Sequence, residues 1–563
     1  MEDLQEVLVK AAQQYYEYLQ DKNLGLSEVA IARYELKNDE LILWLKNNVV
    51  DMDLKITGAL LLRVGEELYN IAEEEPIQLH FYDEKQKVLY FSLSLDMAKI
   101  LSKAQKNNIA FALFSDLKFL VKNVEDFFSK YGHKVTLPQV IVANEVPYIS
   151  ALSEEQNQAL SMVLTNPLSY VWGPPGTGKT QAVLFEALLY YIKQGKKVAV
   201  IATTNNALEQ VLRTLIKQFD ALGLERKNIL RLGTPTLHYM KEFPQTCDPS
   251  LLEQKDGANL FNFQDTLKTR LKNAFVVGVT LDGFIKRYEI LELKFSHIFL
   301  DECAYAPLIK TCALCIDNTP LALFGDHKQL SPVCEMPLNE LMKPKNESAH
   351  IWNLSALFIE SLCQGTSIKE IIKKYGQTCD IPYFSLMRMS KLSKTYRYGD
   401  NLAHILDTYI YHIGLEGNGE QMELFVLDSG KKSEQDKHIS ESEARACEYL
   451  CAKFNQESYA IITPFVKQRQ RLMRHMPRER IFTIHGSQGQ EFDNVIFSPV
   501  SLHYHLTDSN QTHALYALNV AISRTKKRFF IVCDYTFWSK QKGQLIWAIL
   551  QHAHVINNMS AIN

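Results

Sequence analysis

The chain has 563 residues, of which 46% are hydrophobic and 22% charged, and its formal net charge is -3. This length excludes a single domain and predicts three or four, each with its own core. The composition is ordinary for a soluble globular protein. The charge gives no global sign of nucleic-acid binding, although a basic groove can occur in a neutral molecule.

No run of about 18 apolar residues is present, so the sequence predicts no transmembrane helix. Residues 1–4 are acidic and lack the basic start of a signal peptide. Cys312 and Cys315 form the only C-x-x-C pair, without a second pair or a His cluster at metal spacing. We therefore expect buried, reduced thiols, no zinc or iron–sulfur site, and an intracellular protein, cytoplasmic or, in a eukaryote, also nuclear.

The N-terminal region alternates between helical and strand patterns. Apolar residues at helical spacing predict one helix over residues 3–20 and another over 117–131. Between them, short apolar runs from 31 to 93, separated by polar turns, predict a small antiparallel sheet or barrel. We expect the helices to form a stalk that holds this β-module away from the main body.

From residue 151 to about 333, strands and helices alternate, which predicts a parallel α/β domain. Its strands are expected at 168–172, 197–202, 275–279, 297–300 and 321–324. A second α/β unit is expected to follow, with strands at 459–462, 494–497 and 528–532. Residues 215–272 show no clean period and are interpreted as an insertion, whereas residues 346–395 are mixed in pattern and hard to place.

A phosphate-binding pattern follows the first of these strands and precedes a helix-like stretch. Gly173, Gly178, Lys179 and Thr180 match G-x-x-x-x-G-K-[ST]. Glycines let backbone N–H groups approach a triphosphate at a helix N-terminus. We expect Lys179 to reach the outer phosphates and the Thr180 hydroxyl to ligate Mg²⁺. The residues expected around the nucleotide are Gly173, Pro174, Pro175, Gly176, Thr177, Gly178, Lys179, Thr180 and Gln181.

Two further elements of an ATPase follow along the chain. The acidic pair Asp301-Glu302 ends an apolar run. Asp301 is expected to hold Mg²⁺, and Glu302 to orient or deprotonate the attacking water. The next apolar run leads into Gly-Asp-His-Lys-Gln-Leu-Ser-Pro at 325–332, at the strand end where parallel sheets bind ligands. Gln329 is expected to sense the γ-phosphate.

The motif at 325–332 resembles a distinctive motif of superfamily 1 helicases. Other stretches resemble further motifs of that family, in the family order: 152–156, 202–207, 278–280, 395–398, 462–465, 483–491 and 518–524. The chain is most similar to the branch that contains the nonsense-mediated-decay RNA helicase and the immunoglobulin-mu-binding helicase. The resemblance spans about residues 150 to 540. It implies an α/β protein with two RecA-like domains, ATP and Mg²⁺ as cofactors, and single-stranded DNA or RNA as partner.

The resemblance also implies a domain order. We expect a helical stalk at about 1–24 and 100–150, carrying a small β-barrel at 25–99. A first RecA-like domain at 151–345 would hold the accessory insertion, and a second would span 346–545, followed by a tail at 546–563. We assume a monomer, with the N-terminal region as the place where protein partners would bind.

Roles for individual residues follow from the resemblance. Gln156 would read adenine, Tyr396 would stack on it, and Arg397 would meet the γ-phosphate. Arg524 would be an arginine finger, and Glu491 would belong to a nucleotide motif. The residues expected to contact nucleic acid are Thr204, Asn205, Thr280, Thr463, Pro464, His485 and Ser487.

The residues alone leave alternatives open at several of these positions. Arg397 also fits a solvated loop arginine, and Tyr396 a core aromatic residue. His485 also fits a loop histidine with ordinary partners. The hydroxyls of Thr204 and Thr280 also fit caps at strand-to-helix turns.

The motifs together predict an ATP-dependent helicase or translocase, which by resemblance would move 5′ to 3′ on a single strand. One position departs from the family: Tyr305 stands where relatives have a Gln that couples the nucleotide to the second domain. That departure, together with the short insertion, motivates an alternative hypothesis. In it the chain is a nucleotide-switched binding module of a larger assembly, with little or no unwinding.

Overall fold

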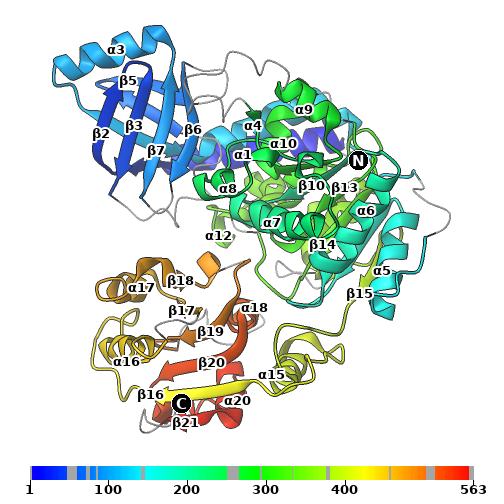
Figure 1. Ribbon diagram of the computed structural model, residues 1–563, viewed down its shortest axis with the longest axis vertical. Coiled ribbons are helices and arrows are strands. Elements are labelled where there is room, and N and C mark those ends of the chain that lie inside the picture. Colours follow the sequence, from blue (N-terminus) through cyan, green and yellow to red (C-terminus); the bar gives the residue numbers. More distant parts are fainter. Residues whose placement is uncertain are drawn as a thin grey trace.

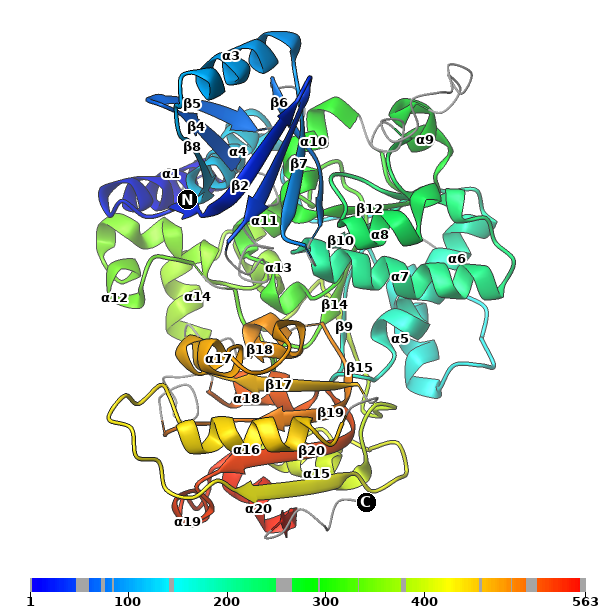
Figure 2. The same ribbon diagram turned by 60° about the vertical axis from the view of Figure 1, so that its left-hand side comes forward.

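The computed structural model of the chain describes residues 3–46, 60–71, 76–83, 86–140, 146–249, 266–291, 294–332, 334–375, 381–454, 458–487, 489–502 and 514–556. It contains one N-terminal sheet and two parallel sheets, so the predicted α/β class with parallel sheets is confirmed. We call the three parts the N-terminal module, the first parallel domain and the second parallel domain. The N-terminal module and the second parallel domain lie toward opposite ends of the longest axis (Figures 1 and 2).

The N-terminal module is an eight-stranded sheet whose paired strands are antiparallel except for β5 and β6. Its strands in sheet order are β1 (Leu26–Val29), β8 (Phe111–Asp116), β4 (Leu60–Val64), β5 (Glu67–Ile71), β6 (Ile77–Asp83), β7 (Val88–Leu93), β3 (Glu40–Leu45) and β2 (Ile31–Lys37). The end strands β1 and β2 are separated only by Ala30, so the sheet curls until its two ends meet there. Alternate residues of β3 are buried inside, as half-buried strands require.

Helix α3 (Leu95–Lys106) belongs to the same module, where it covers the end far from the parallel domains (Figure 1). Because β8 and α3 belong to the sheet module, the predicted stalk over 100–150 is shorter than expected. The helices outside the sheet in this region are α1 (Leu4–Asp21) and α4 (Leu117–Tyr131), which pack against each other. The apolar run at 111–114 is what draws β8 into the sheet.

Helix α1 is anchored to the first parallel domain. The ring of Tyr15 on α1 lies 4.9 Å from that of Trp352. The indole N–H of Trp352 donates to the carbonyl of Ala11 at 3.1 Å. Trp352 ends the 3₁₀ segment Pro344–Trp352, so α1 rests on the start of the 346–395 stretch, whose sequence pattern is mixed.

The first parallel domain has a seven-stranded sheet. Its order is β11 (Ile229–Arg231), β12 (Val276–Thr280), β10 (Val198–Ala202), β13 (Ile298–Leu300), β14 (Leu321–Gly325), β9 (Leu168–Trp172) and β15 (Arg388–Lys391). The central strands are buried on both faces, as parallel sheets between helices require. The helices of this part are α5 (Glu154–Thr165), α6 (Phe185–Lys193), α7 (Asn205–Ala221), α8 (Leu237–Glu242), α9 (Leu267–Asn273), α10 (Leu281–Leu291), α11 (Leu308–Cys312), α12 (Leu338–Leu341), α13 (Ile359–Cys363) and α14 (Ile368–Tyr375). Cys312 and Cys315 are buried in its core, as predicted.

Strand pairing differs from two of the expected domain limits. Strand β15 pairs with β9, so the chain up to Lys391 lies with the first sheet and not with the second. Helix α7 reaches Ala221 and β11 pairs with β12, so part of the expected 215–272 insertion belongs to the main sheet. β15 is short and mostly exposed, which explains why no apolar run revealed it.

The second parallel domain has a six-stranded sheet. Its order is β18 (Ile481–Thr483), β17 (Tyr459–Thr463), β19 (Phe492–Phe497), β20 (Thr525–Cys533), β16 (Glu423–Asp428) and β21 (His554–Ile556). Its helices are α15 (Asp400–Leu406), α16 (Glu441–Cys451), α17 (Val466–Leu472), α18 (Ala514–Ile522), α19 (Tyr535–Trp538) and α20 (Leu545–His552). The predicted tail from residue 546 is part of this domain up to residue 556, because α20 packs in its core and β21 pairs with β16. Residues 557–563 lie outside the described residues.

Candidate functional site

The phosphate-binding pattern forms a loop between β9 and a helical turn at Lys179–Leu184. Gly176 and Gly178 have φ angles of +81° and +86°, a region that favours glycine. A Cβ atom on Gly176 would lie 2.4 Å from the Cβ of Arg397. These glycines therefore shape the loop and let a segment from the second parallel domain approach it closely.

Lys179 lies at the centre of this loop. Its ammonium group donates to the carbonyls of Gly173 at 2.6 Å and Pro174 at 3.2 Å. Burial lowers the pKa of Lys179, although the carboxylates of Asp326, Glu302 and Asp301 oppose the shift. A partly buried ammonium that donates to carbonyl oxygens at the edge of a cavity is well suited to bind phosphate oxygens.

The acidic pair follows β13, beside the loop. The hydroxyl of Thr180 donates to a carboxylate oxygen of Asp301 at 3.2 Å. Glu302 has a φ of +52°, and its N–H donates to the other oxygen of Asp301 at 3.0 Å. Burial and then the neighbouring Glu302 raise the pKa of Asp301 to about 6, although Lys179 opposes this.

The Thr180–Asp301 pair fits a magnesium ion. A hydroxyl and a carboxylate oxygen are adjacent, and Mg²⁺ prefers oxygen ligands of this kind together with phosphates and waters. A divalent cation would also relieve the electrostatic cost of burying the Asp301 carboxylate. Among the residues that the structure describes, no group of three His, Cys, Asp or Glu side chains could hold a metal ion.

Gln156 lies behind the phosphate loop at the start of α5. Its side-chain oxygen accepts from the N–H of Ser153, and the hydroxyl of Ser153 accepts from the N–H of Gln156, which forms a capping box. Its amide N–H₂ donates to the carbonyl of Thr177 at 3.1 Å. In this conformation, Gln156 supports the loop.

Gln329 lies where β14 ends, between the acidic pair and the second parallel domain. Its amide nitrogen donates to Asp326 at 3.0 Å, and its amide oxygen accepts from the guanidinium of Arg524 at 3.2 Å. Arg524 follows α18 and is almost fully buried. Burial and then Arg397 lower the pKa of Arg524 to about 10.

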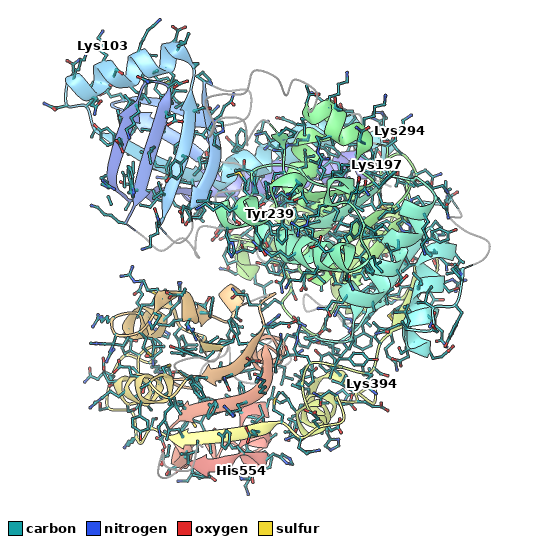
Figure 3. All side chains as sticks on the ribbon, viewed as in Figure 1. Lys103, Lys197, Tyr239, Lys294, Lys394 and His554 are labelled. Carbon is teal, nitrogen blue, oxygen red and sulfur yellow. The ribbon has the colours of Figure 1, made fainter. Side chains whose placement is uncertain are left out.

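The segment 395–397 brings the second parallel domain onto the phosphate loop. The hydroxyl of Thr395 donates to the carbonyl of Pro175 at 2.8 Å, and the N–H of Tyr396 donates to the carbonyl of Gly176 at 2.9 Å. The neighbouring Lys394 lies where the chain passes from one parallel domain to the other (Figure 3). Tyr396 is 53% exposed, so it is not a core residue in this structure.

Arg397 extends from this segment toward two elements of the second parallel domain. Its guanidinium donates to the carbonyl of Ser523 at 3.0 Å and pairs with Glu491. Glu491 also pairs with Lys526 at 2.8 Å. Burial opposes ionisation of Glu491, but the charges of Arg397 and Lys526 outweigh it and lower its pKa. The alternative that Arg397 is a solvated loop residue is wrong for this structure.

These elements enclose one cavity of about 570 Å³. Both parallel domains contribute to its lining, which consists of Pro175, Gly176, Thr177, Gly178, Lys179, Thr180, Gln181, Ala207, Gln210, Val211, Thr214, Asp301, Glu302, Gln329, Tyr396, Arg397, Gly489, Glu491, Asp493, Arg524, Lys526 and Lys527. Positive side chains from both domains therefore face one volume, as a site for a polyanion requires.

Several lining residues were not predicted as site residues. Helix α7 contributes Ala207, Gln210, Val211 and Thr214, whose spacing places them on one helical face. A Cβ atom on Gly489 would lie 2.7 Å from the Gln210 side-chain oxygen, so the two domains also approach there. Gln210 and Thr214 gave only a weak signal for this face, because α7 carries polar residues on much of its surface.

Two of the residues predicted to contact nucleic acid cap helical turns. The hydroxyl of Thr204 accepts from the N–H of Ala207 at 3.1 Å, and that of Thr280 accepts from the N–H of Gly283 at 3.1 Å. The capping alternative is therefore confirmed for both hydroxyls. Asn205 accepts from the buried guanidinium of Arg231 at 2.6 Å.

The other predicted contacts lie on the second parallel domain. Thr463 and Ser487 are fully buried, and the Ser487 hydroxyl donates to the carbonyl of Ile484 at 2.7 Å. Pro464 is partly exposed and His485 exposed. Of these four side chains, only Pro464 and His485 are presented at the surface.

Comparisons with known proteins agree with this geometry. Two protein-family models, each described as an AAA domain, match residues 151–261 and 380–536. The chain is 24% identical over 464 residues to the ATP-dependent helicase upf1 of Schizosaccharomyces pombe, covering 71% of this chain and 48% of that protein. It is also 24% identical over 464 residues to the DNA-binding protein SMUBP-2 of Mesocricetus auratus, and this match covers 69% of this chain and 43% of that protein. The chain thus spans less than half of either relative.

Among solved structures, the crystal structure of arterivirus nonstructural protein 10, a helicase, covers 92% of this chain and 79% of its own. The superposition has a TM-score of 0.39, and the two sequences are 12% identical. In the described part of the chain, no helix has both the length and the apolar character needed to cross a membrane.

Proposed function

We propose that this chain, which belongs to the branch of superfamily 1 helicases that contains Upf1 and SMUBP-2, hydrolyses ATP to move along single-stranded DNA or RNA and to open duplexes. The observation that carries the proposal is the cavity between the two parallel domains. The phosphate loop of the first parallel domain lines it, together with Arg397 and Arg524 from the second.

In this proposal the parallel domains are the two RecA-like domains of a translocase. The curled N-terminal sheet is a small barrel, carried by α1 and α4 as a stalk. The first domain would run from about residue 151 to Lys391, since β15 pairs with β9. Residues 232–272, the remainder of the predicted insertion, would be the accessory segment.

The first domain would bind the triphosphate. Backbone N–H groups of the loop and the ammonium of Lys179 would hold the phosphates, and Glu302 would orient or deprotonate the attacking water. Gln156 and Tyr396 would hold the adenine, a role supported by the exposure of the Tyr396 ring. Thr180 and Asp301 would hold Mg²⁺, which when bound neutralises charge on the phosphates.

The second domain would complete the site. Arg397 and Arg524 line the same cavity as the loop, where they would neutralise charge that develops on the transferred phosphoryl group. Because Gln329 bonds to Arg524, it would report the γ-phosphate to this domain. Hydrolysis would therefore require the two domains to be closed on each other.

Opening and closing of the domains would move them along a single strand, 5′ to 3′. The strand ends around Thr204, Asn205 and Thr280 would bind it on one domain, and Pro464 and His485 on the other. Since the hydroxyls of Thr204 and Thr280 are used as caps, we propose contacts there through backbone groups. Such binding is held mainly by phosphates and weakens with salt.

Tyr305 supports a second candidate function, a nucleotide-switched module with little unwinding. Its side chain is partly buried and packs against the core, so it is not free to act as the polar link that the family Gln provides. In that case ATP hydrolysis would be insensitive to nucleic acid.

An unwinding assay on tailed duplexes tests the proposal. We expect ATP-dependent unwinding from a 5′ tail, little from a 3′ tail, and none with the variant Lys179→Ala. Unwinding from a 3′ tail alone would refute the direction. No unwinding from either tail would refute the helicase activity and favour the switch.

A further inference from the structure

A buried cluster of hydrogen bonds joins the two parallel domains beside the cavity. Its centre is the carboxylate of Asp326, which is 2% exposed. One oxygen accepts from the indole N–H of Trp172 at 3.1 Å and from the N–H of Lys328 at 3.0 Å. The other accepts from Gln329 at 3.0 Å and from the hydroxyl of Tyr411 at 2.7 Å.

Three of these four donors belong to the first parallel domain. Trp172 is the last residue of β9, directly before the phosphate loop, and Gln329 is the proposed γ-phosphate sensor. Tyr411 is the exception, because it follows α15 in the second parallel domain. Asp326 therefore connects the loop and the sensor to the other domain through one phenol.

Tyr411 also contacts the helix that carries the proposed arginine finger. Its oxygen accepts from the side-chain N–H₂ of Asn519 on α18 at 2.6 Å. The same Asn519 group donates to the carbonyl of Lys328 at 2.8 Å. Arg524 follows α18 and bonds to Gln329, so the cluster closes into a ring around the sensor.

The backbone holds Tyr411 in place. It ends a π-helical turn, Asp407–Tyr411, and is followed by His412 in the left-handed region with a φ of +52°. The carboxylate of Asp407 accepts from the N–H groups of Ile413 at 2.8 Å and Gly414 at 3.2 Å. Such local π turns often occur at functional sites.

The phenol of Tyr411 can donate one hydrogen bond to Asp326 and accept another from Asn519 at the same time. Tyr411 is 3% exposed, and burial raises its pKa well above the ordinary value, so it remains a neutral donor to Asp326. Loss of its hydroxyl would leave a buried carboxylate with one donor fewer and remove one acceptor of the Asn519 amide. Groups connected in this way respond as a unit, since each bond polarises the next.

We propose that Tyr411 is a positioning residue that couples the phosphate loop and Gln329 of the first parallel domain to helix α18 and Arg524 of the second. The inference rests on the proposed function and adds a residue outside the motifs that carry it. When the domains close, Tyr411 fixes α18 against Asp326 and so sets Arg524 at the cavity. When Gln329 moves with the γ-phosphate, the shared carboxylate transmits that movement to the second domain.

The test is the variant Tyr411→Phe, which removes one oxygen and keeps the ring. The matched control is Tyr409→Phe in the same turn, because the Tyr409 ring packs on the core and its hydroxyl has no hydrogen-bond partner among the described residues. We expect kcat for ATP to fall on the order of tenfold in Tyr411→Phe, with KM within about twofold. Stimulation by a single-stranded oligonucleotide should fall with it, whereas the control should keep wild-type values.

A double-mutant cycle with Asn519→Ala separates coupling from a general loss of structure. If the residues act as one unit, the double variant should be no slower than the slower single variant. Wild-type kcat and stimulation in Tyr411→Phe, or multiplicative losses in the cycle, would overturn the inference. A wild-type chain that does not hydrolyse ATP would instead refute the proposed function, and this inference with it.

Discussion

The guanidinium of Arg397 is paired with the carboxylate of Glu491, which lies 94 residues further along the chain. Arg397 is thereby partly neutralised within the cavity where a triphosphate is proposed to bind. A phosphate must compete with Glu491 for this arginine. In the proposed function, the pair would therefore tune how strongly the second domain holds the nucleotide.

The variant Glu491→Gln tests this competition. It keeps the size of the side chain but removes its charge, so Arg397 and Lys526 become available to phosphates. We expect the KM for ATP to fall on the order of threefold, and less at high salt because screening weakens the effect. The control Glu423→Gln breaks an ion pair with Arg528 outside the cavity and should leave KM unchanged. A higher KM in Glu491→Gln would show instead that the carboxylate itself binds the nucleotide.

Because Arg397 and Thr395 lie close to Gly176, a side chain at Gly176 should impair ATPase activity, whereas one at Gly195 should not. Alanine at Gly176 would lie against Arg397 and Thr395, whereas alanine at Gly195, also at positive φ, meets nothing within 4 Å. Both variants should lose about 1 kcal/mol of unfolding free energy from the left-handed conformation. Only Gly176→Ala should lose ATPase activity, on the order of a hundredfold. Equal activity of the two variants would contradict the docking of segment 395–397 on the loop.

Arg524 should act on the rate of hydrolysis more than on ATP binding. Arginine fingers contribute about 10³ or more to kcat in related chemistry. We expect Arg524→Ala to lower kcat by about that factor, with KM changed by less than about fivefold. Arg528→Ala is the control, because Arg528 lies four residues further along, on β20, and is paired with Glu423 outside the cavity. A proportionate rise in KM with little loss of kcat would assign Arg524 to ground-state binding.

The buried carboxyl group of Glu443 should make the stability of the fold depend on pH. It is buried in α16 and accepts from the Ser498 hydroxyl at 2.6 Å and the Val500 N–H at 3.0 Å. Burial raises its pKa to about 8, so the folded chain binds this proton more strongly than the unfolded chain, whose value is about 4.3. Between these values the free energy of unfolding should fall as pH rises, by at most about 1.4 kcal/mol per pH unit.

Thermal unfolding at pH 5, 6.5 and 8 measures this dependence. The Tm of Glu443→Gln should change less over that range than the wild-type Tm. Glu448→Gln, on the same helix but partly exposed, should keep the wild-type slope. An unchanged slope in Glu443→Gln would show that other groups control the pH dependence.

Much of the fold could be predicted because burial leaves a pattern. The predicted central strands match β9, β10, β12, β13 and β14 to within one residue at either end, since each is an apolar run between helices. The exposed edge strand β15 left no such pattern, and its pairing with β9 depends on where the chain returns in space. Apolar patterns in the sequence therefore predicted the buried central strands, but they did not predict where the first parallel domain ends.

The motif residues of the site could be predicted from the sequence, but the long-range contacts between them could not. The phosphate loop and Asp301 carry short-range patterns, and the structure brings them together. The pairing of Arg397 with Glu491 and the contact of Tyr411 with Asp326 join residues 94 and 85 positions apart. Such contacts depend on the packing of two domains, which no local pattern specifies. The hydroxyls of Thr204 and Thr280 show the opposite case. Their positions in motifs suggested contact with nucleic acid, whereas in the structure they cap helical turns.

The most direct test of the central claim is the ATPase rate with single-stranded DNA, single-stranded RNA and no nucleic acid, measured side by side. We expect wild-type hydrolysis to rise about tenfold or more with one or both oligonucleotides, because the strand favours the closed cavity. Lys179→Ala should abolish hydrolysis in every condition, and Lys193→Ala, exposed at the end of α6, should not change it. A wild-type rate that is indifferent to both oligonucleotides, or full turnover in Lys179→Ala, would contradict the account.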